Sequence, residues 1–104
     1  MRVFVCRAGD VPLGTARRFE PAGLPPIALA RCDAGLYAVI DNCSHEDYPL
    51  SEGEVTSDLC EIECVRHGSI FSLADGTPQC LPATQPVRTF ELETDGDDVY
   101  VVVP

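Results

Sequence analysis

The chain has 104 residues, which allows one domain with one modest hydrophobic core. Seventeen acidic residues outnumber seven basic ones, all of them arginine, and the formal net charge is −10. A chain this acidic repels phosphate backbones and anionic lipid, so we expect neither nucleic acid nor a membrane as a partner. A protein with a basic docking face is the expected complement.

The N-terminal segment, Met1 to Arg7, is too short and too soon interrupted by charge for a signal peptide. No apolar run approaches the roughly 20 residues that cross a bilayer. We therefore expect a cytoplasmic protein, and a monomer. In a reducing compartment, six cysteines favour metal binding or redox chemistry over a disulfide framework.

The chain favours short strands over helices, because nine prolines and eight glycines are spread along it and no segment has a helical period. Strands are expected at Val3–Cys6, Ile27–Arg31, Leu36–Ile40, Glu54–Thr56, Leu59–Glu63, Ile70–Leu73, Val87–Glu93 and Val99–Val103. Turn residues predict two hairpins, around Asp33-Ala34-Gly35 and around Thr94-Asp95-Gly96-Asp97-Asp98. The predicted fold class is all-β, an antiparallel sandwich or barrel. It forms a single domain over residues 1–104, with two irregular loops inserted mid-chain.

These two loops contain both histidines of the protein, and each histidine follows a cysteine closely. The first loop carries Cys43-Ser44-His45 and the second carries Cys64-Val65-Arg66-His67. Eighteen residues separate His45 from Cys64, and they include strand-like pieces that could form a hairpin and bring the loops face to face. Two cysteines and two histidines are a ligand set for a metal or a metal cluster.

The pattern C-x-H…C-x-x-H, followed by Gly68, resembles the Rieske iron–sulfur proteins. Leu50-Ser51-Glu52-Gly53 is similar to the segment after the first ligand loop of that family, and Pro82-Ala83 is similar to its proline-bearing third loop. The resemblance covers roughly residues 36–103 and places the cluster-binding part at about residues 41–86. It implies the Rieske fold.

The resemblance implies one [2Fe–2S] cluster, with Cys43 and Cys64 on one iron and His45 and His67 on the other. Two ferric ions, two sulfides and two thiolates carry no net formal charge, whereas four thiolates would leave −2. Neutral imidazole ligands therefore raise the reduction potential above that of a four-cysteine ferredoxin. Zinc is the rival metal, but zinc sites usually take two cysteines from one loop and two histidines from another.

Three residues near the ligands are candidates for tuning the cluster: Ser69, Arg66 and Pro82. Ser69 matches a serine that in high-potential relatives donates a hydrogen bond to a bridging sulfide, although it is equally explained as a plain turn serine. Phe71 stands where those relatives have a tyrosine, and we expect it in the core. Arg66 lies beside the cluster, where it could offset the surrounding acids or contact a partner, and Pro82 belongs to the third loop.

Proton-pumping members of the family carry an additional disulfide between their ligand loops. The matching positions here are Tyr48 and Arg66, so that disulfide cannot form. Together with the missing membrane anchor, this departure favours the soluble ferredoxin branch. Four further cysteines are expected to be small buried hydrophobic residues, with a weak alternative role for Cys60 as a fifth ligand or redox sensor: Cys6, Cys32, Cys60 and Cys80.

Both histidines are committed to the cluster, so no base remains for catalysis and we expect an electron carrier. The resemblance implies a flavin-dependent NAD(P)H reductase as electron donor and a terminal oxygenase as acceptor. The alternatives are an accessory or redox-sensing role in iron–sulfur assembly, and a small subunit of a nitrite-reductase-like complex.

Overall fold

A computed structural model gives the fold and describes residues 1–44, 47–66 and 68–103. Within these residues the chain forms nine β-strands and two short 3-10 helices, η1 (Ala8–Asp10) and η2 (Leu50–Glu52), which confirms the all-β class. Every strand pair is antiparallel. In the described part of the chain no helix is long and apolar enough to span a bilayer.

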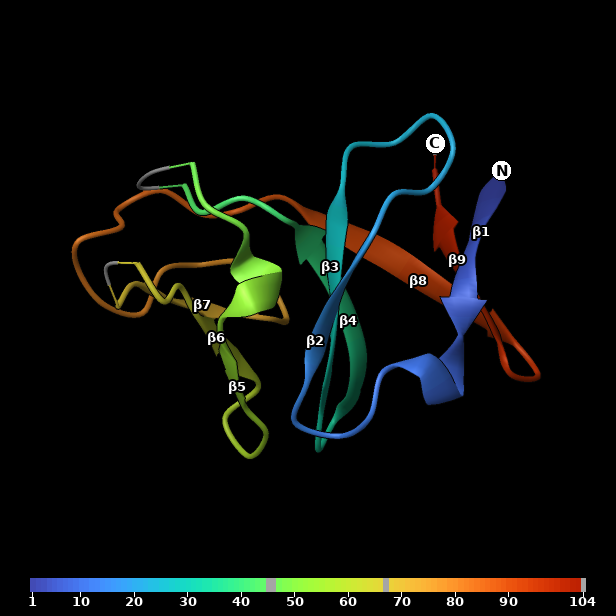
Figure 1. Cartoon of the computed structure of the whole chain (residues 1–104), viewed down its shortest axis with the longest axis horizontal. Coiled ribbons are helices and arrows are strands. Elements are labelled where there is room, and N and C mark those ends of the chain that lie inside the picture. The colour runs from blue at the N-terminus through green and yellow to red at the C-terminus, as the bar shows by residue number, and fades with distance from the viewer. Residues whose placement is uncertain (45–46, 67, 104) are drawn as a thin grey trace.

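The strands form two sheets (Figure 1). The larger sheet has the order β1 (Arg2–Arg7), β9 (Asp98–Val102), β8 (Thr89–Asp95), β4 (Gly35–Ile40), β3 (Ile27–Cys32) and β2 (Ala16–Phe19). The smaller sheet has the order β5 (Glu54–Thr56), β6 (Glu61–Glu63) and β7 (Ile70–Ser72). The termini lie at one end of the molecule, and the loops that carry the predicted ligands lie at the other.

Strand β3 is buried on both faces and separates two hydrophobic cores. Ala28 and Ala30 belong to the core shared with the smaller sheet, whereas Ile27 and Leu29 belong to the core under β9. Side chains alternate between the faces of a strand, so a strand covered on both sides needs an unbroken apolar run. The sequence Ile27-Ala28-Leu29-Ala30 supplies that run.

Several elements differ from the sequence expectation: the two 3-10 helices were not predicted, and β8, expected at Val87–Glu93, begins and ends two residues later. Strand β2 was not predicted, because two of its four residues are arginines and it shows no apolar alternation. It forms through ladder hydrogen bonds to β3, along an edge where charged side chains remain in solvent. The strand that was expected to begin at Leu59 begins at Glu61. Cys60 adopts a positive φ of 50°, which does not fit a regular strand.

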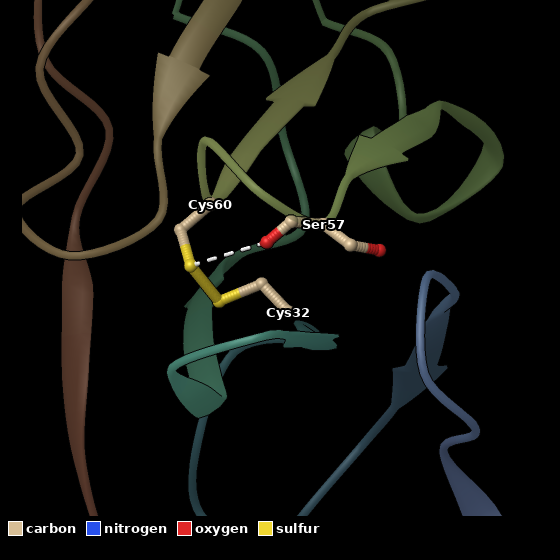
Figure 2. Close-up of a disulfide and its surroundings, with 3 residues drawn as sticks. All are labelled: Cys32, Ser57 and Cys60. Carbon is tan, nitrogen blue, oxygen red and sulfur yellow. Dashed lines mark hydrogen bonds between the residues drawn. A yellow bond between two sulfur atoms is a disulfide. The ribbon is translucent and has the colours of Figure 1, made fainter.

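The cysteine expectation was wrong in two respects. Cys32 and Cys60 form a disulfide between the end of β3 and the loop before β6, so the alternative role of Cys60 as a fifth ligand is excluded (Figure 2). Cys80 is exposed rather than buried. Cys6 is buried as expected. Burial is the main cause that raises the pKa of its thiol, and the nearby Asp10 carboxylate raises it further.

The disulfide fastens the smaller sheet to the larger one. Beside it, the backbone N–H of Asp33 in the β3–β4 turn donates to the Ser57 carbonyl at 2.9 Å. The paired cysteines lie 28 positions apart, and nothing in the local sequence predicts their pairing, which arises only when the two sheets pack together.

Replacing both cysteines in the variant Cys32→Ser/Cys60→Ser should lower thermal stability. Cross-linking across this separation restricts the unfolded chain by about 3 to 4 kcal/mol, which corresponds to a fall in Tm of about 10 °C or more. Differential scanning calorimetry measures the change in Tm. An unchanged Tm in the double variant would show that the cross-link is not formed in solution.

Candidate metal centre

The first loop, residues 41–51, joins β4 to η2 and carries Cys43. The Cys43 side chain is buried, and its backbone N–H donates to the Tyr48 carbonyl at 2.9 Å. The Asn42 amide spans the same loop, accepting from the Tyr48 N–H at 3.1 Å and donating to the Asp47 carboxylate at 3.0 Å. These bonds fix a tight loop with its cysteine directed inward.

A buried carboxylate closes the base of the first loop. The Asp41 side chain is fully buried and accepts hydrogen bonds from the backbone N–H and the hydroxyl of Ser51, both at 2.7 Å. Arg18 of β2 adds an ion pair at 3.1 Å. A buried charge requires partners of this kind, so Asp41 joins the two ends of the loop and attaches them to the larger sheet.

The second loop, residues 64–69, joins β6 to β7 and carries Cys64. It repeats the closure of the first loop, because the Cys64 N–H donates to the carbonyl five positions onward, that of Ser69, at 2.7 Å. Gly68 donates to the Cys64 carbonyl at 2.9 Å and has a φ of 74°, which glycine adopts without steric cost. Both cysteines thus occupy equivalent positions in similar turns.

The segment that follows the first loop passes very close to the strand that leads into the second loop, and Gly53 lies at the point of closest approach. A Cβ at residue 53 would collide with the carbonyl of Glu63, which immediately precedes Cys64. The φ of Gly53 is −86°, which other residues adopt, so the requirement here is space. This approach brings the chain segments next to the two loops together, and Cys43 and Cys64 lie in the same buried core.

The third loop, residues 79–86, touches both of the others. The Ser44 hydroxyl donates to the Gln85 carbonyl at 2.5 Å, and the Cys80 sulfur lies 3.4 Å from the Gly68 carbonyl. Pro82 follows a cis peptide bond and is half-buried. The third loop therefore contacts both cysteine-bearing turns.

The structure places the predicted residues as follows. It brings Cys43 and Cys64 together, and it buries Phe71 in the same core as expected. His45 and His67 lie outside the described residues. Sequence reasoning missed the roles of Asp41 and Asn42. Their only signal was that aspartate and asparagine often bond to nearby backbone at the start of a loop.

Ser69 provides a direct test of whether a cluster fits here. Its hydroxyl is completely buried, and no described residue accepts or donates a hydrogen bond to it. An unpartnered buried hydroxyl is costly, so it calls for an acceptor that the protein chain does not itself supply. A sulfide or thiolate sulfur beside the two buried cysteines meets that need, and the donor set therefore fits an iron–sulfur cluster.

Comparison with known proteins gives the same answer. Residues 1–91 match the family model of the Rieske [2Fe-2S] domain. The chain belongs to this family. Its cofactor is accordingly a Rieske-type [2Fe–2S] cluster, which accepts and releases one electron.

Similar proteins are ferredoxin components of dioxygenases. The 3-phenylpropionate/cinnamic acid dioxygenase ferredoxin subunit of Shigella boydii serotype 4 (strain Sb227) is 37% identical over 103 residues, covering 99% of this chain and 94% of that protein. The ferredoxin of carbazole 1,9a-dioxygenase from Nocardioides aromaticivorans IC177 is 29% identical, with a TM-score of 0.90 over 97% of this chain and 96% of that one. A chain in a complex of reduced oxygenase and oxidized ferredoxin of carbazole 1,9a-dioxygenase is 39% identical, with a TM-score of 0.86 over 95% and 99% of the two chains.

The substitution Gly53→Ala should impair cluster binding, although alanine readily adopts the backbone conformation at that position. The added methyl group meets the Glu63 carbonyl and must push the start of β5 away from the end of β6, directly before Cys64. We expect less iron and sulfide per protein and a lower ratio of visible to ultraviolet absorbance. The matched control is Gly9→Ala, where an added Cβ meets nothing within 4 Å. Equal cluster content in the two variants would contradict the role assigned to Gly53.

Proposed function

We propose that Cys43, His45, Cys64 and His67 are the four ligands of the cluster. The support is the burial of both cysteines in one core and their equivalent turns, together with the unpartnered Ser69 hydroxyl beside them. In this assignment the thiolates hold one iron and the imidazoles hold the other. In the sequence, each histidine follows its cysteine by two or three positions.

We further propose that the protein is an electron carrier, not a catalyst, and that it delivers single electrons to a terminal oxygenase. The observation that carries this proposal is the similarity over nearly the whole chain to ferredoxin subunits of dioxygenases. The 39% identical chain belongs to a complex of an oxygenase and a ferredoxin, which supports an oxygenase as partner. A flavin-dependent NAD(P)H reductase is the proposed donor, and the cytoplasm the proposed location.

The surface around the ligand loops suits a transient redox complex. Val65 in the second loop and Leu81 in the third loop are exposed apolar side chains, with 51% and 77% of their surface accessible. Residues 41–86 contain nine acidic residues and one arginine. An apolar contact surrounded by negative charge favours a partner with a basic rim and gives association that weakens with salt.

A reconstituted electron-transfer assay tests this function. NAD(P)H, a flavin-dependent reductase and the oxygenase component of a 3-phenylpropionate/cinnamic acid dioxygenase are combined with and without this protein, and hydroxylated product is measured. We expect product only when the ferredoxin is present, with a rate that falls several-fold between low and high ionic strength.

Two results would contradict the proposal. One is a cluster that the reductase reduces but that no oxygenase reoxidises under single-turnover conditions. The other is product formation that is equally fast when the ferredoxin is omitted.

A further inference from the structure

A contact between an arginine and an aromatic ring joins the two ligand loops. The guanidinium carbon of Arg66, in the second loop, lies 5.8 Å from the centroid of the Tyr48 ring, in the first loop. This distance is within the range in which a cation is attracted to the face of a ring. The contact crosses from one cysteine-bearing turn to the other.

The Tyr48 ring is a fixed platform for this contact. It packs against the core that contains Cys43 and Cys64. Its backbone is held from both sides, since its N–H donates to Asn42 and its carbonyl accepts from Cys43. A ring held in this way restricts the guanidinium that rests on it.

Arg66 is the one basic residue among residues 41–86 and sits in the turn between Cys64 and Gly68. The position of its guanidinium group therefore fixes where the arginine charge of residues 41–86 lies. Reduction adds one negative charge to the cluster, so a cation held nearby stabilises the reduced form.

We propose that Tyr48 and Arg66 are positioning residues that fasten the second ligand loop to the first and hold a positive charge beside the cluster. The proposal rests on the ligand assignment made above. It predicts that the ring and the guanidinium act as one unit. Losing either should loosen the loops and lower the reduction potential.

A double-mutant cycle tests the proposal in the holoprotein. The variants are Tyr48→Leu, Arg66→Gln and their combination, together with Tyr48→Phe, which keeps an aromatic ring. The first readout is the rate of cluster loss, followed as bleaching of visible absorbance in the presence of an iron chelator without oxygen. The second is the midpoint potential of the cluster.

We expect Tyr48→Leu and Arg66→Gln each to speed cluster loss about two- to fivefold, the range of an exposed cation–π contact. The double variant should lose its cluster no faster than the more severe single variant, and Tyr48→Phe should stay near the parent rate. Both single variants should also lower the midpoint potential, including Tyr48→Leu, which changes no charge. A merely structural role for the ring would leave the potential in place.

The chain offers a matched control in the larger sheet. The Arg17 guanidinium carbon lies 5.7 Å from the Phe19 ring, and Arg17 also donates to the Asp10 carbonyl at the end of η1. Arg17→Gln therefore removes the same charge and a similar contact outside the ligand loops. It should change neither readout to the extent that Arg66→Gln does.

Additive effects of the two substitutions, or a Tyr48→Leu variant that matches the parent in both readouts, would overturn the proposal. These outcomes require a parent protein that carries the cluster. They are therefore distinct from failure of the ligand assignment, in which the parent itself would show no Rieske spectrum.

Discussion

The close approach of Gly53, between η2 and β5, to strand β6 is the constraint on which the centre depends. Gly53 lies so near the Glu63 carbonyl that no side chain fits between them, and Glu63 leads directly into Cys64. Without this approach, two similar turns would each present a cysteine separately. With this close approach, both cysteines belong to one core. The smaller sheet supports the second loop and holds it next to the first.

Several further contacts hold the ligand loops and the smaller sheet in place. Asp41 closes the first loop and ties it to β2 through Arg18, while the Cys32–Cys60 disulfide ties the opposite end of the smaller sheet to β3. The third loop then contacts both ligand turns through Ser44 and Gly68. A cluster that changes charge by one unit benefits from such a rigid frame, because little of the protein has to move when the electron arrives.

Charge is distributed unevenly between the two parts of the molecule. On the larger sheet arginines are paired with acids, as Arg2 is with Glu93 at 2.8 Å and Arg7 with Asp97 at 3.4 Å. Residues 41–86 contain nine acids and one arginine, and Glu54 and Glu63 are directly paired across β5 and β6. Like charges on facing positions cost stability in the free protein, which a partner with a basic surface would recover on docking.

Much of this could be predicted from the sequence. Turn residues and short apolar runs were sufficient for most strands, and the two cysteine–histidine pairs were sufficient for the family. What could not be predicted depends on packing between distant segments. Strand β2 forms only against β3, Cys32 finds Cys60 only when the sheets meet, and Asp41 is recognisable as a clamp only once Ser51 and Arg18 surround it.

We propose that two loops supply unlike ligands to two irons. Mössbauer spectroscopy of protein enriched in ⁵⁷Fe tests it most directly, because thiolate and imidazole coordination give iron sites with different isomer shifts. The account predicts two inequivalent ferric sites in the oxidised protein and, after reduction, a ferrous site confined to the imidazole-bound iron. Two equivalent irons, or a purified protein that contains zinc in place of iron and sulfide, would contradict it.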